Sequence, residues 1–388
     1  MVMVCAVAVL AIWNTIAWPR LRATASPHTA PRISVLIPAR DEASRIGYLL
    51  QDLSHCDCGV LEILVYDDHS TDGTAQVIEE AARRDPRIRR LPPKPLPDGW
   101  RGKPFACYQL ALAAQGEWLL FLDADVRLGA EAPARIIGEA ETRKATLLSA
   151  WPGLVLKSFP EKWLMPLLNY VVFTLFPAFL SFRDRRPGLG LAHGACIACR
   201  AAEYRAMDGH AAVRKELFED TRLAQAWRRH GGFGLCVDGQ DLVRTRMYDS
   251  FGAIWRGFSK NLGPAFRRRF SFALFLIFHA LLGVVPFLAL AASFARREWL
   301  ASPFISVSAV LLIRAGQAFR FRYPLWSVLL HPFAVLLMLA LALVSRFRYE
   351  TGGVEWKGRR YRKGSPADPQ PNGVGRGAFA PPEECQMP

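Results

Sequence analysis

Two aspartates, Asp123 and Asp125, stand one residue apart directly after the apolar run 118–122. A run this short, preceded by Gly116 and ended by a carboxylate, is typical of a strand that is buried on both faces. Ligands of open α/β sheets bind just beyond the carboxyl ends of such strands. Two carboxylates there could share Mg²⁺ or Mn²⁺, and a cation held in this way usually also binds phosphate oxygens. The alternative interpretation of residues 123–125 is a solvated turn at the end of a strand.

Two further acidic pairs follow other predicted strands. The pair 41–42 comes shortly after the strand predicted at 33–37, and the pair 67–68 comes directly after the one predicted at 62–66. The carboxyl ends of parallel strands lie at the same edge of a sheet. We therefore expect the three acidic clusters to line one rim.

The elements that must position these carboxylates alternate between strand and helix. Strands are predicted at 33–37, 62–66, 88–91, 118–122, 146–151 and 191–200, and helices at 41–53, 74–84, 106–115, 131–144 and 219–229. Strands separated by helices of about ten residues indicate an α/β domain with a parallel, doubly wound sheet. The domain is expected to cover residues 32–262.

Apolar segments flank this domain on both sides. Residues 1–19 are predicted to form an anchor with its N-terminus outside, because Arg20 and Arg22 follow the apolar run and do not precede it. After the domain, the membrane region 272–345 contains two spans, at 272–294 and 325–345. The segment 299–313 is either a third crossing or a re-entrant segment, so the region holds two or three helices.

One uncharged segment, 163–182, lies inside the predicted domain. Its length would allow a crossing, but a crossing there would divide the globular domain, because more of that domain follows. A segment lying in the membrane interface, or one that lines the acceptor site, is the favoured interpretation. The chain is predicted to end in a tail, 346–388, that is first basic and then disordered.

The composition agrees with a membrane protein. The 388 residues carry a net charge of +15, and 51% of them are hydrophobic, mostly in blocks. Arginine-rich flanks that face the anionic cytoplasmic lipid surface account for the charge. Nucleic-acid binding is disfavoured, because the sequence contains neither an aromatic-and-basic RNA motif nor a zinc-finger spacing.

The eight cysteines do not define a disulfide framework. Cys196 and Cys199 have the spacing of a metal half-site or a redox pair. No second CxxC and no paired histidines complete a metal site, and both residues lie in an apolar run. We interpret them as small buried hydrophobic residues, which fits a reducing compartment.

The ordered acidic motifs resemble those of family 2 glycosyltransferases, which have the GT-A fold and use nucleotide sugars. The resemblance covers about residues 32–262. It is carried by Pro38-Ala-Arg40-Asp-Glu42, Val65 to Asp72, Gly102-Lys103, Asp123-Ala-Asp125 and Glu219-Asp220.

Two later motifs resemble membrane enzymes that glycosylate lipids, such as ceramide glucosyltransferases, carotenoid-acid glycosyltransferases and hopanoid-associated glycosyltransferases. These motifs are Trp255 to Asn261 and Trp356 to Tyr361. The Gln-x-x-Arg-Trp motif of processive polysaccharide synthases is absent from the sequence, so transfer of a single sugar is favoured over polymerisation.

The resemblance implies roles for the donor-binding residues. Asp67 or Asp68 would hold the uridine base, and the sequence does not distinguish them. Lys103 would approach the nucleotide as a point charge. Asp123 would contact the ribose or a metal-bound water, and Asp125 would bind the metal. Pro38, Arg40 and Glu42, in the first motif, belong to the same substrate-binding set.

The resemblance also implies how the acceptor is activated. Asp220 would be the general base, and the neighbouring Glu219 could raise its pKa toward a useful value. The alternative for this pair is a solvated helix N-terminus.

Two more pairs of residues are candidates for substrate binding. His193 and Gly194 would let the backbone approach the donor sugar, although a tight turn is an equally simple explanation. Trp255 and Arg256 would close over the diphosphate or the acceptor. Alternatively, Trp255 belongs to an aromatic belt that leads into the first late span.

The expected protein is therefore a multi-pass protein of the cell (inner) membrane with a cytoplasmic catalytic domain. It would be an inverting, metal-dependent glycosyltransferase that moves a hexose from a nucleotide sugar, which the resemblance implies to be UDP-linked, to a hydroxyl or carboxyl of a lipid. No protein partner is evident from the sequence. The alternatives are a polyprenyl-phosphate sugar synthase and a catalytically silent nucleotide-binding scaffold.

Overall fold

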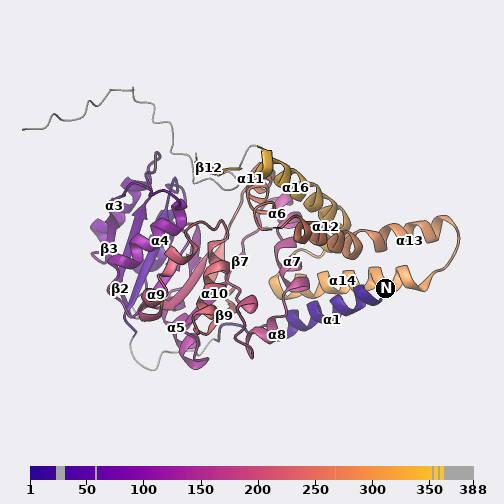
Figure 1. Cartoon of the computed structure of the whole chain (residues 1–388), viewed down its shortest axis with the longest axis horizontal. Coiled ribbons are helices and arrows are strands. Elements are labelled where there is room, and N and C mark those ends of the chain that lie inside the picture. Colours follow the sequence, from indigo (N-terminus) through magenta and orange to yellow (C-terminus); the bar gives the residue numbers. More distant parts are fainter. Residues whose placement is uncertain (23–30, 57–58, 267, 352–353, 357–358, 362–388) are drawn as a thin grey trace, which may run out of the picture.

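The computed structural model describes residues 1–22, 31–56, 59–266, 268–351, 354–356 and 359–361. An α/β domain lies at one end of the molecule and a group of apolar helices at the other (Figure 1). The disorder predicted for the end of the chain concerns residues outside the described part.

The α/β domain is built on a seven-stranded sheet in the order β3-β2-β1-β4-β8-β6-β9. Its strands are β1 (Ile33–Ala39), β2 (Val60–Asp67), β3 (Ile88–Leu91), β4 (Trp118–Leu122), β6 (Leu147–Trp151), β8 (Cys196–Arg200) and β9 (Gly234–Asp238). Pairing is parallel except that β8 runs antiparallel to β4 and β6. The predicted α/β class and mostly parallel sheet are confirmed.

Strand β8 corrects two details of the prediction. It occupies only the second half of the predicted segment 191–200, and its direction is reversed. The reason is the path of the chain, because residues 191–195 lie against the cavity at the carboxyl edge of the sheet and β8 must start from there. Cys196 and Cys199 of this strand are buried free thiols, as predicted.

Helices cover both faces of the sheet, which explains why its strands are apolar along their whole length. Side chains of β1 alternate, with Val35 and Ile37 in one core and Leu36 in the other. The helices are α2 (Ile46–Ser54), α3 (Thr74–Arg84), α4 (Gly102–Ala113), α5 (Ala132–Thr142), α9 (Ala201–Ala206) and α10 (Glu219–Arg229), with short 3₁₀ turns at Pro187–Leu189 and Gly209–Val213. A small second sheet contains β5 (Val126–Leu128), β7 (Gly153–Leu154) and β10 (Val243–Thr245).

The helix predicted from residue 41 begins later, at Ile46. Asp41 has a φ of 51°, which is left-handed and ends any helix at that point. The backbone N–H of Asp41 donates to Ser70 in the loop after β2, and that of Glu42 donates to Thr74, the first residue of α3. The first two acidic motifs are therefore joined by hydrogen bonds at the edge of the sheet.

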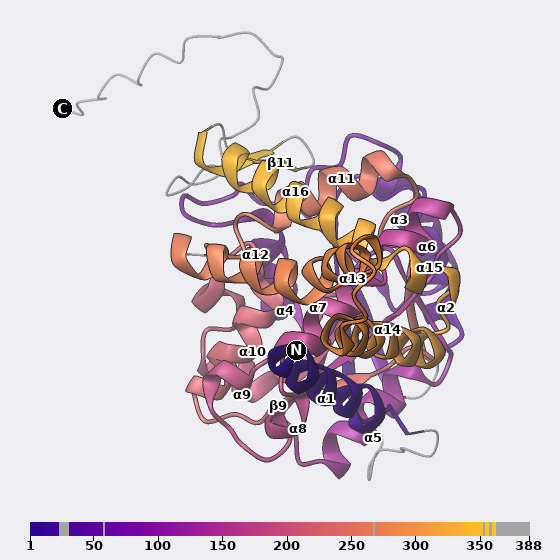
Figure 2. The same ribbon diagram turned by 90° about the vertical axis from the view of Figure 1, so that its right-hand side faces the viewer.

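The second part of the molecule is helical (Figures 1 and 2). It contains α1 (Val2–Ala17), α6 (Phe159–Leu164), α7 (Leu167–Leu175), α8 (Ala178–Ser181), α11 (Phe251–Asn261), α12 (Arg269–Gly283), α13 (Val285–Ala295), α14 (Ala301–Phe321), α15 (Trp326–Leu329) and α16 (His331–Thr351), followed by the hairpin strands β11 (Val354–Trp356) and β12 (Arg359–Tyr361). Helix α16 thus continues into the segment predicted as a basic tail.

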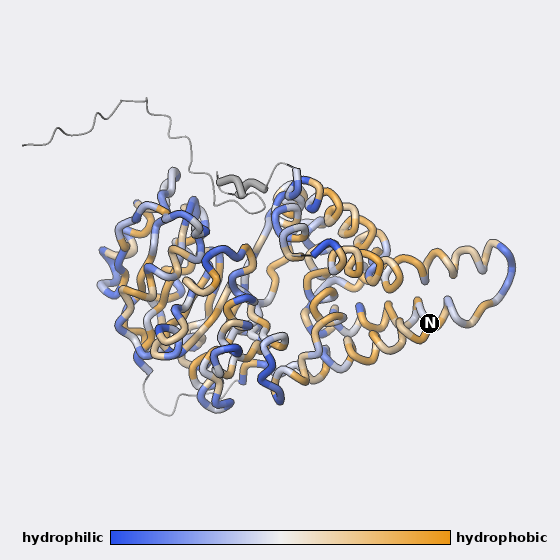
Figure 3. Tube along the Cα trace, in the orientation of Figure 1, coloured by the Kyte–Doolittle hydropathy of each residue, from blue (hydrophilic) through white to orange (hydrophobic). Residues whose placement is uncertain are grey.

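In the part of the chain that the structure describes, three helical segments are long and apolar enough to cross a membrane: 269–295, 301–321 and 331–351. The first is interrupted at Val284, two residues before Pro286, whose missing N–H and bulky ring interfere with the helix one turn earlier. Helix α14 extends well beyond the predicted 299–313, so its length fits a full crossing better than a re-entrant segment. Hydrophobic residues run along these helices, and hydrophilic ones mark the turn between α13 and α14 (Figure 3).

The uncharged segment 163–182 forms α7 and α8, which pack within the helical part. Asn14 of α1 donates to the carbonyl oxygens of Phe173 and Phe176, and its own side-chain oxygen accepts from the backbone of Ala178. The segment therefore joins the anchor helix to the rest of the molecule. Its position relative to a membrane surface stays a prediction.

Candidate active site

A cavity of about 480 Å³ lies at the carboxyl ends of β1 and β4. The acidic motifs predicted to share one rim do meet here, since each contributes at least one carboxylate to the wall. The acidic residues that line the cavity are Glu42, Asp68, Asp123, Asp125, Glu216, Glu219 and Asp220.

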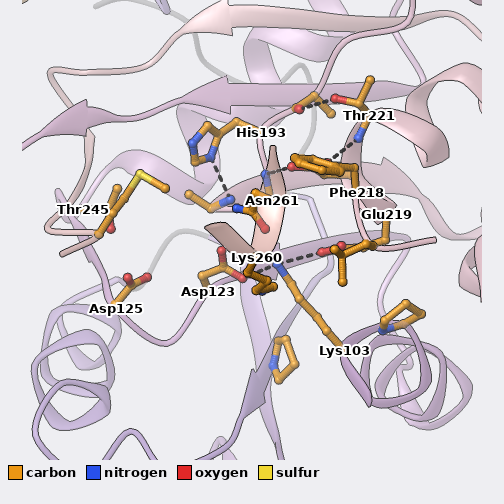
Figure 4. Close-up of a pocket in the computed structure, with 18 of the residues that line it drawn as sticks. Lys103, Asp123, Asp125, His193, Phe218, Glu219, Thr221, Thr245, Lys260 and Asn261 are labelled. Carbon is orange, nitrogen blue, oxygen red and sulfur yellow. Dashed lines mark hydrogen bonds and ion pairs between the residues drawn. The ribbon is translucent and has the colours of Figure 1, made fainter. Parts of the chain in front are cut away.

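Lys103 is the centre of the charged cluster (Figure 4). Its Nζ lies 2.7 Å from Asp123 Oδ1 and 2.9 Å from Glu219 Oε1. Burial alone would lower the pKa of Lys103, but the two carboxylates raise it well above its usual range. Two helix N-termini bring the charges together, because α4 begins at Gly102 and α10 begins at Glu219.

The adjacent carboxylates Glu219 and Asp220 differ in their proton affinity. Burial would raise the pKa of Glu219, but its pairing with Lys103 lowers it overall. Burial, followed by the charge of Glu219, raises the pKa of Asp220 to about 7. The charge of Glu219 thus contributes to the raised pKa of Asp220, as the predicted pair requires, but burial contributes more.

Backbone groups hold Asp220 in place. Its Oδ2 accepts from Gly194 N at 2.9 Å and its Oδ1 from Thr221 N at 2.6 Å. The Thr221 hydroxyl in turn donates to the carbonyl oxygen of Ala192. A carboxylate that is fixed in this way and titrates near neutral pH has the properties required of a general base.

Asp125 lies in a part of the cavity where negative charges are close together. Burial, and then the charges of Asp123 and Glu42, raise its pKa to about 7, although Arg45 lies 3.8 Å away. Within the described residues, no group of three His, Cys, Asp or Glu side chains is arranged to hold a metal. A cation at Asp125 would therefore need further ligands from a bound molecule.

Asp67 and Asp68, at the carboxyl end of β2, lie in two different environments. Asp68 lines the cavity, and Arg40 donates to its backbone carbonyl at 2.6 Å. Asp67 is absent from the cavity wall and instead accepts from Ser70 N at 3.1 Å, with Arg90 3.7 Å from its other oxygen. Of the two residues that the sequence left open, only Asp68 faces the cavity.

His193 and Gly194 both line the cavity. Burial lowers the pKa of His193 to about 4, so its ring is neutral, and its Nδ1 accepts from Ala195 N at 3.2 Å. A Cβ at Gly194 would stand 2.9 Å from Lys103 Nζ and 3.4 Å from Asp220 Oδ2. The structure thus adds a reason for this glycine, because a side chain would displace the charged cluster.

Trp255 and Arg256 do not line this cavity. Trp255 is half-buried on α11, its ring 6.0 Å from that of Phe251, and Arg256 is exposed. The same helix contributes Phe258, Lys260 and Asn261 instead. The second half of the predicted motif, and not its first two residues, therefore reaches the site in this structure.

The apolar wall of the cavity is the part that sequence reasoning largely missed. Leu168 and Val172 of α7 belong to it, and their i, i+4 spacing was the available signal within the predicted acceptor lining. The remaining large apolar wall residues are Trp151, Leu191, Leu217, Phe218, Met247, Tyr248, Phe258 and Leu262. The helical part of the molecule thus supplies much of this wall.

Comparison with known proteins agrees with the geometry. Residues 34–206 match the family described as Glycosyl transferase family 2. The chain also resembles a solved structure, the mannosyltransferase PcManGT from Pyrobaculum calidifontis in complex with GDP-Man and Mn²⁺. The TM-score is 0.53 at 18% identity, with 88% of this chain and 94% of that chain covered. The predicted resemblance to family 2 glycosyltransferases and the GT-A class of fold are confirmed.

Among curated proteins the chain is similar to 4,4'-diaponeurosporenoate glycosyltransferases. One from Staphylococcus haemolyticus is 30% identical over 237 residues, which cover 60% of this chain and 62% of that protein. One from Staphylococcus aureus is 26% identical over 349 residues, which cover 85% of this chain and 88% of that protein.

Proposed function

We propose that this protein is a membrane-bound inverting glycosyltransferase that moves a hexose from a nucleotide sugar to the carboxyl or hydroxyl group of an isoprenoid-like lipid. The observation that carries the proposal is a single cavity with two kinds of wall. Carboxylates and Lys103 line the edge of the sheet, and Leu168, Val172 and Phe258 of the helical part supply apolar surface. The relatives are named as glycosyltransferases of 4,4'-diaponeurosporenoate, and the ending of that name denotes a carboxylate, which supports the acceptor class.

Asp220 would accept the proton of the acceptor, either from a hydroxyl group or from a carboxyl group that the apolar wall of the cavity keeps in its protonated form. As that proton moves to the Asp220 carboxylate, the acceptor oxygen forms a bond to the anomeric carbon, and the bond from this carbon to the diphosphate breaks. The nucleoside diphosphate leaves with the bonding electron pair, so direct displacement inverts the anomeric centre. A pKa of about 7 leaves a substantial fraction of Asp220 ionised at neutral pH.

We assign donor binding to the residues around Asp68. Asp68 and Arg40 line the cavity beside the ends of β1 and β2, with Pro38 and Glu42. Lys103 stays with Asp123 and Glu219, where it would stabilise the negative charge of both the protein and the diphosphate.

We assign Mg²⁺ or Mn²⁺ to Asp125, with Asp123 beside it. Burial and the nearby charges of Asp123 and Glu42 both raise the pKa of Asp125, and a bound cation would favour its ionised form. Asp123 Oδ1 already pairs with Lys103, so phosphate oxygens of the donor would complete the coordination. When bound, the metal would supply Lewis-acid stabilisation of the departing diphosphate.

We place the catalytic domain in the cytoplasm, with two crossings after it. The N-terminus lies near the helices α13 and α14, away from the α/β domain (Figure 1). The C-terminal end of helix α16 lies on the catalytic side, because Arg346 donates to the carbonyl oxygens of Gly263 and Phe266, shortly after α11. Crossings by α12–α13 and by α14 would therefore keep the basic tail on the side of the catalytic domain.

The test is product formation in membranes that contain the full chain. Labelled UDP- and GDP-sugars are supplied with Mn²⁺ and an apolar polyene carboxylic acid, and the lipid product is identified by mass. We expect a glycosyl ester from one donor, and none from Asp220→Ala. The control is Glu131→Ala, whose side chain is 74% exposed and outside the cavity.

Two outcomes would replace this proposal with one of its alternatives. Transfer to a polyprenyl phosphate, but to no carboxyl or hydroxyl lipid, would identify a polyprenyl-phosphate sugar synthase. Nucleotide binding without any product, for every donor and acceptor offered, would identify a silent scaffold.

A further inference from the structure

A second polar cluster lies inside the helical part, away from the catalytic cavity. Its members are Tyr170 of α7, Arg314 and Gln317 of α14, and His331 at the start of α16, and each has at most 1% of its surface exposed. None of them lines the catalytic cavity. The surrounding core is apolar and is formed by residues of α1, α7, α12, α14 and α16.

The four side chains converge from three helices. The rings of Tyr170 and His331 are 4.5 Å apart, and Arg314 Cζ lies 5.9 Å from the centre of the Tyr170 ring. Arg314 Nη1 donates to Gln317 Oε1 at 3.4 Å and to the carbonyl oxygen of Pro166 at 3.2 Å. They therefore form one cluster.

Hydrogen-bond donors in this cluster outnumber acceptors. Among the described residues, Arg314 Nε, Gln317 Nε2, the Tyr170 hydroxyl and both ring nitrogens of His331 have no partner. The arginine and amide nitrogens can only donate, the hydroxyl can donate, and a neutral histidine carries one N–H. Nearby His279 adds one acceptor, because its Nδ1 faces the carbonyl oxygen of Phe275 and its Nε2 has no partner among the described residues. The unpartnered N–H and O–H groups still outnumber the unpartnered acceptors.

The charge of Arg314 is also uncompensated. Within the described part of the chain, no ion pair includes Arg314 or His331, and the contacts of Arg314 are to neutral groups. A buried guanidinium without a counter-ion is unfavourable, and an ionisable residue inside a membrane helix marks a functional site with a partner of opposite charge. Helix α16 begins at His331, so its positive N-terminal end also points to a negative ligand.

We propose that this cluster binds the anionic head group of a membrane lipid, either a carboxylate or a phosphate. Such a group supplies several acceptor oxygens, which match the four donor side chains, and one negative charge, which matches the guanidinium of Arg314. A lipid is the natural source, because the outer faces of the surrounding helices expose residues such as Leu281, Leu312 and Phe333. A water molecule could satisfy the donors but would not neutralise the guanidinium.

The site would share α7 with the catalytic cavity. Leu168 and Val172 face the cavity, while Tyr170, between them in sequence, packs against His331 and Arg314. Residues two positions apart on a helix point in nearly opposite directions. A lipid head group bound at Tyr170 would therefore hold the helix that forms the apolar wall of the catalytic cavity.

The experiment uses the purified full chain, delipidated in neutral detergent. It is incubated separately with phosphatidylglycerol, oleate and phosphatidylcholine, and retained lipid is counted by native mass spectrometry. We expect one tightly retained anionic lipid. Arg314→Gln should weaken that retention by about tenfold or more, as loss of a charge-assisted bond implies. Retention of phosphatidylglycerol would identify a phosphate ligand, and retention of oleate a carboxylate.

Two further variants keep the test decisive. Tyr170→Phe preserves the ring and its packing and should weaken retention by a smaller factor, which matters if Arg314→Gln does not fold. Arg296→Gln, at the exposed turn after α13, should behave as wild type. Equal retention of phosphatidylcholine and the anionic lipids, or unchanged retention in both Arg314→Gln and Tyr170→Phe, would overturn the proposal.

Discussion

The catalytic cavity and the buried cluster of the helical part are imbalanced in opposite senses. In the cavity, Lys103 compensates Asp123 and Glu219, and the charge that remains is negative. Burial, and then the neighbouring carboxylates, raise the pKa values of Asp125 and Asp220 to about 7. In the helical part, the surplus consists of donors and of one guanidinium. The sign of the surplus indicates the kind of ligand, a cation or a proton in the first region and an anion in the second.

The largest expected effect tests the negative surplus. Asp125→Asn should lower the transfer rate by about 10²-fold or more. Without the metal, the leaving group is less stabilised and the activation free energy rises by several kcal/mol. The measurement is the initial rate as a function of Mn²⁺ concentration. In the wild type, Mn²⁺ should bind more tightly as the pH rises through about 7, because the metal competes with the proton on Asp125. Full activity of the variant in EDTA would contradict the metal assignment.

Removing the cation of the catalytic cluster should destabilise the fold. Lys103→Met leaves Asp123 and Glu219 without their partner. The Lys103 side chain is 37% exposed, so solvent screens part of the loss, and we expect about 1–3 kcal/mol. Thermal unfolding of the purified protein measures the change, with the exposed Lys157→Met as the control. An unchanged unfolding temperature would show that the cluster contributes no stability.

The matching change in the helical part should act in the opposite direction. Without anionic lipid, Arg314→Met removes a buried charge that has no counter-ion, and we expect stabilisation of about 1–2 kcal/mol. When phosphatidylglycerol or oleate is present, the advantage should shrink or reverse, because only the wild type gains from binding. Unfolding temperatures of both proteins with and without these lipids decide the point. Strong destabilisation without lipid would show that the guanidinium is already compensated.

A smaller effect concerns the pH dependence of the reaction. Asp220 must be ionised to accept a proton, so activity should fall as the pH falls through about 7. Glu219→Gln removes a neighbouring negative charge, which favours the ionised form of Asp220 and lowers its pKa. The acidic limb of kcat/KM should therefore move to lower pH by about one unit, measured at saturating Mn²⁺. If the acidic limb of the kcat/KM profile stays in place or moves to higher pH in this variant, ionisation of Asp220 is not its cause.

Much of the fold could be predicted because its signals are local. Apolar runs of five residues that end at acidic motifs indicated β1, β2 and β4, and parallel pairing then brought Glu42, Asp68 and Asp123 to one rim. The membrane helices were visible as apolar blocks. The start of α2 was misplaced, since Asp41 adopts a left-handed conformation that hydrogen bonds from a distant loop support.

The class of fold and the kinds of residue at the catalytic rim could be inferred from the order of amino acids, because strand periodicity and motif spacing depend on near neighbours. Three other features appear only in the folded molecule: the pairing of Lys103 with Asp123 and Glu219, the position of Asp68 and not Asp67 on the cavity wall, and the contact of Tyr170 with Arg314 and His331. The physical reason is that pKa values, ion pairs and unsatisfied donors depend on distances between remote segments. Those distances follow from how the helices and strands pack, and no local pattern encodes them.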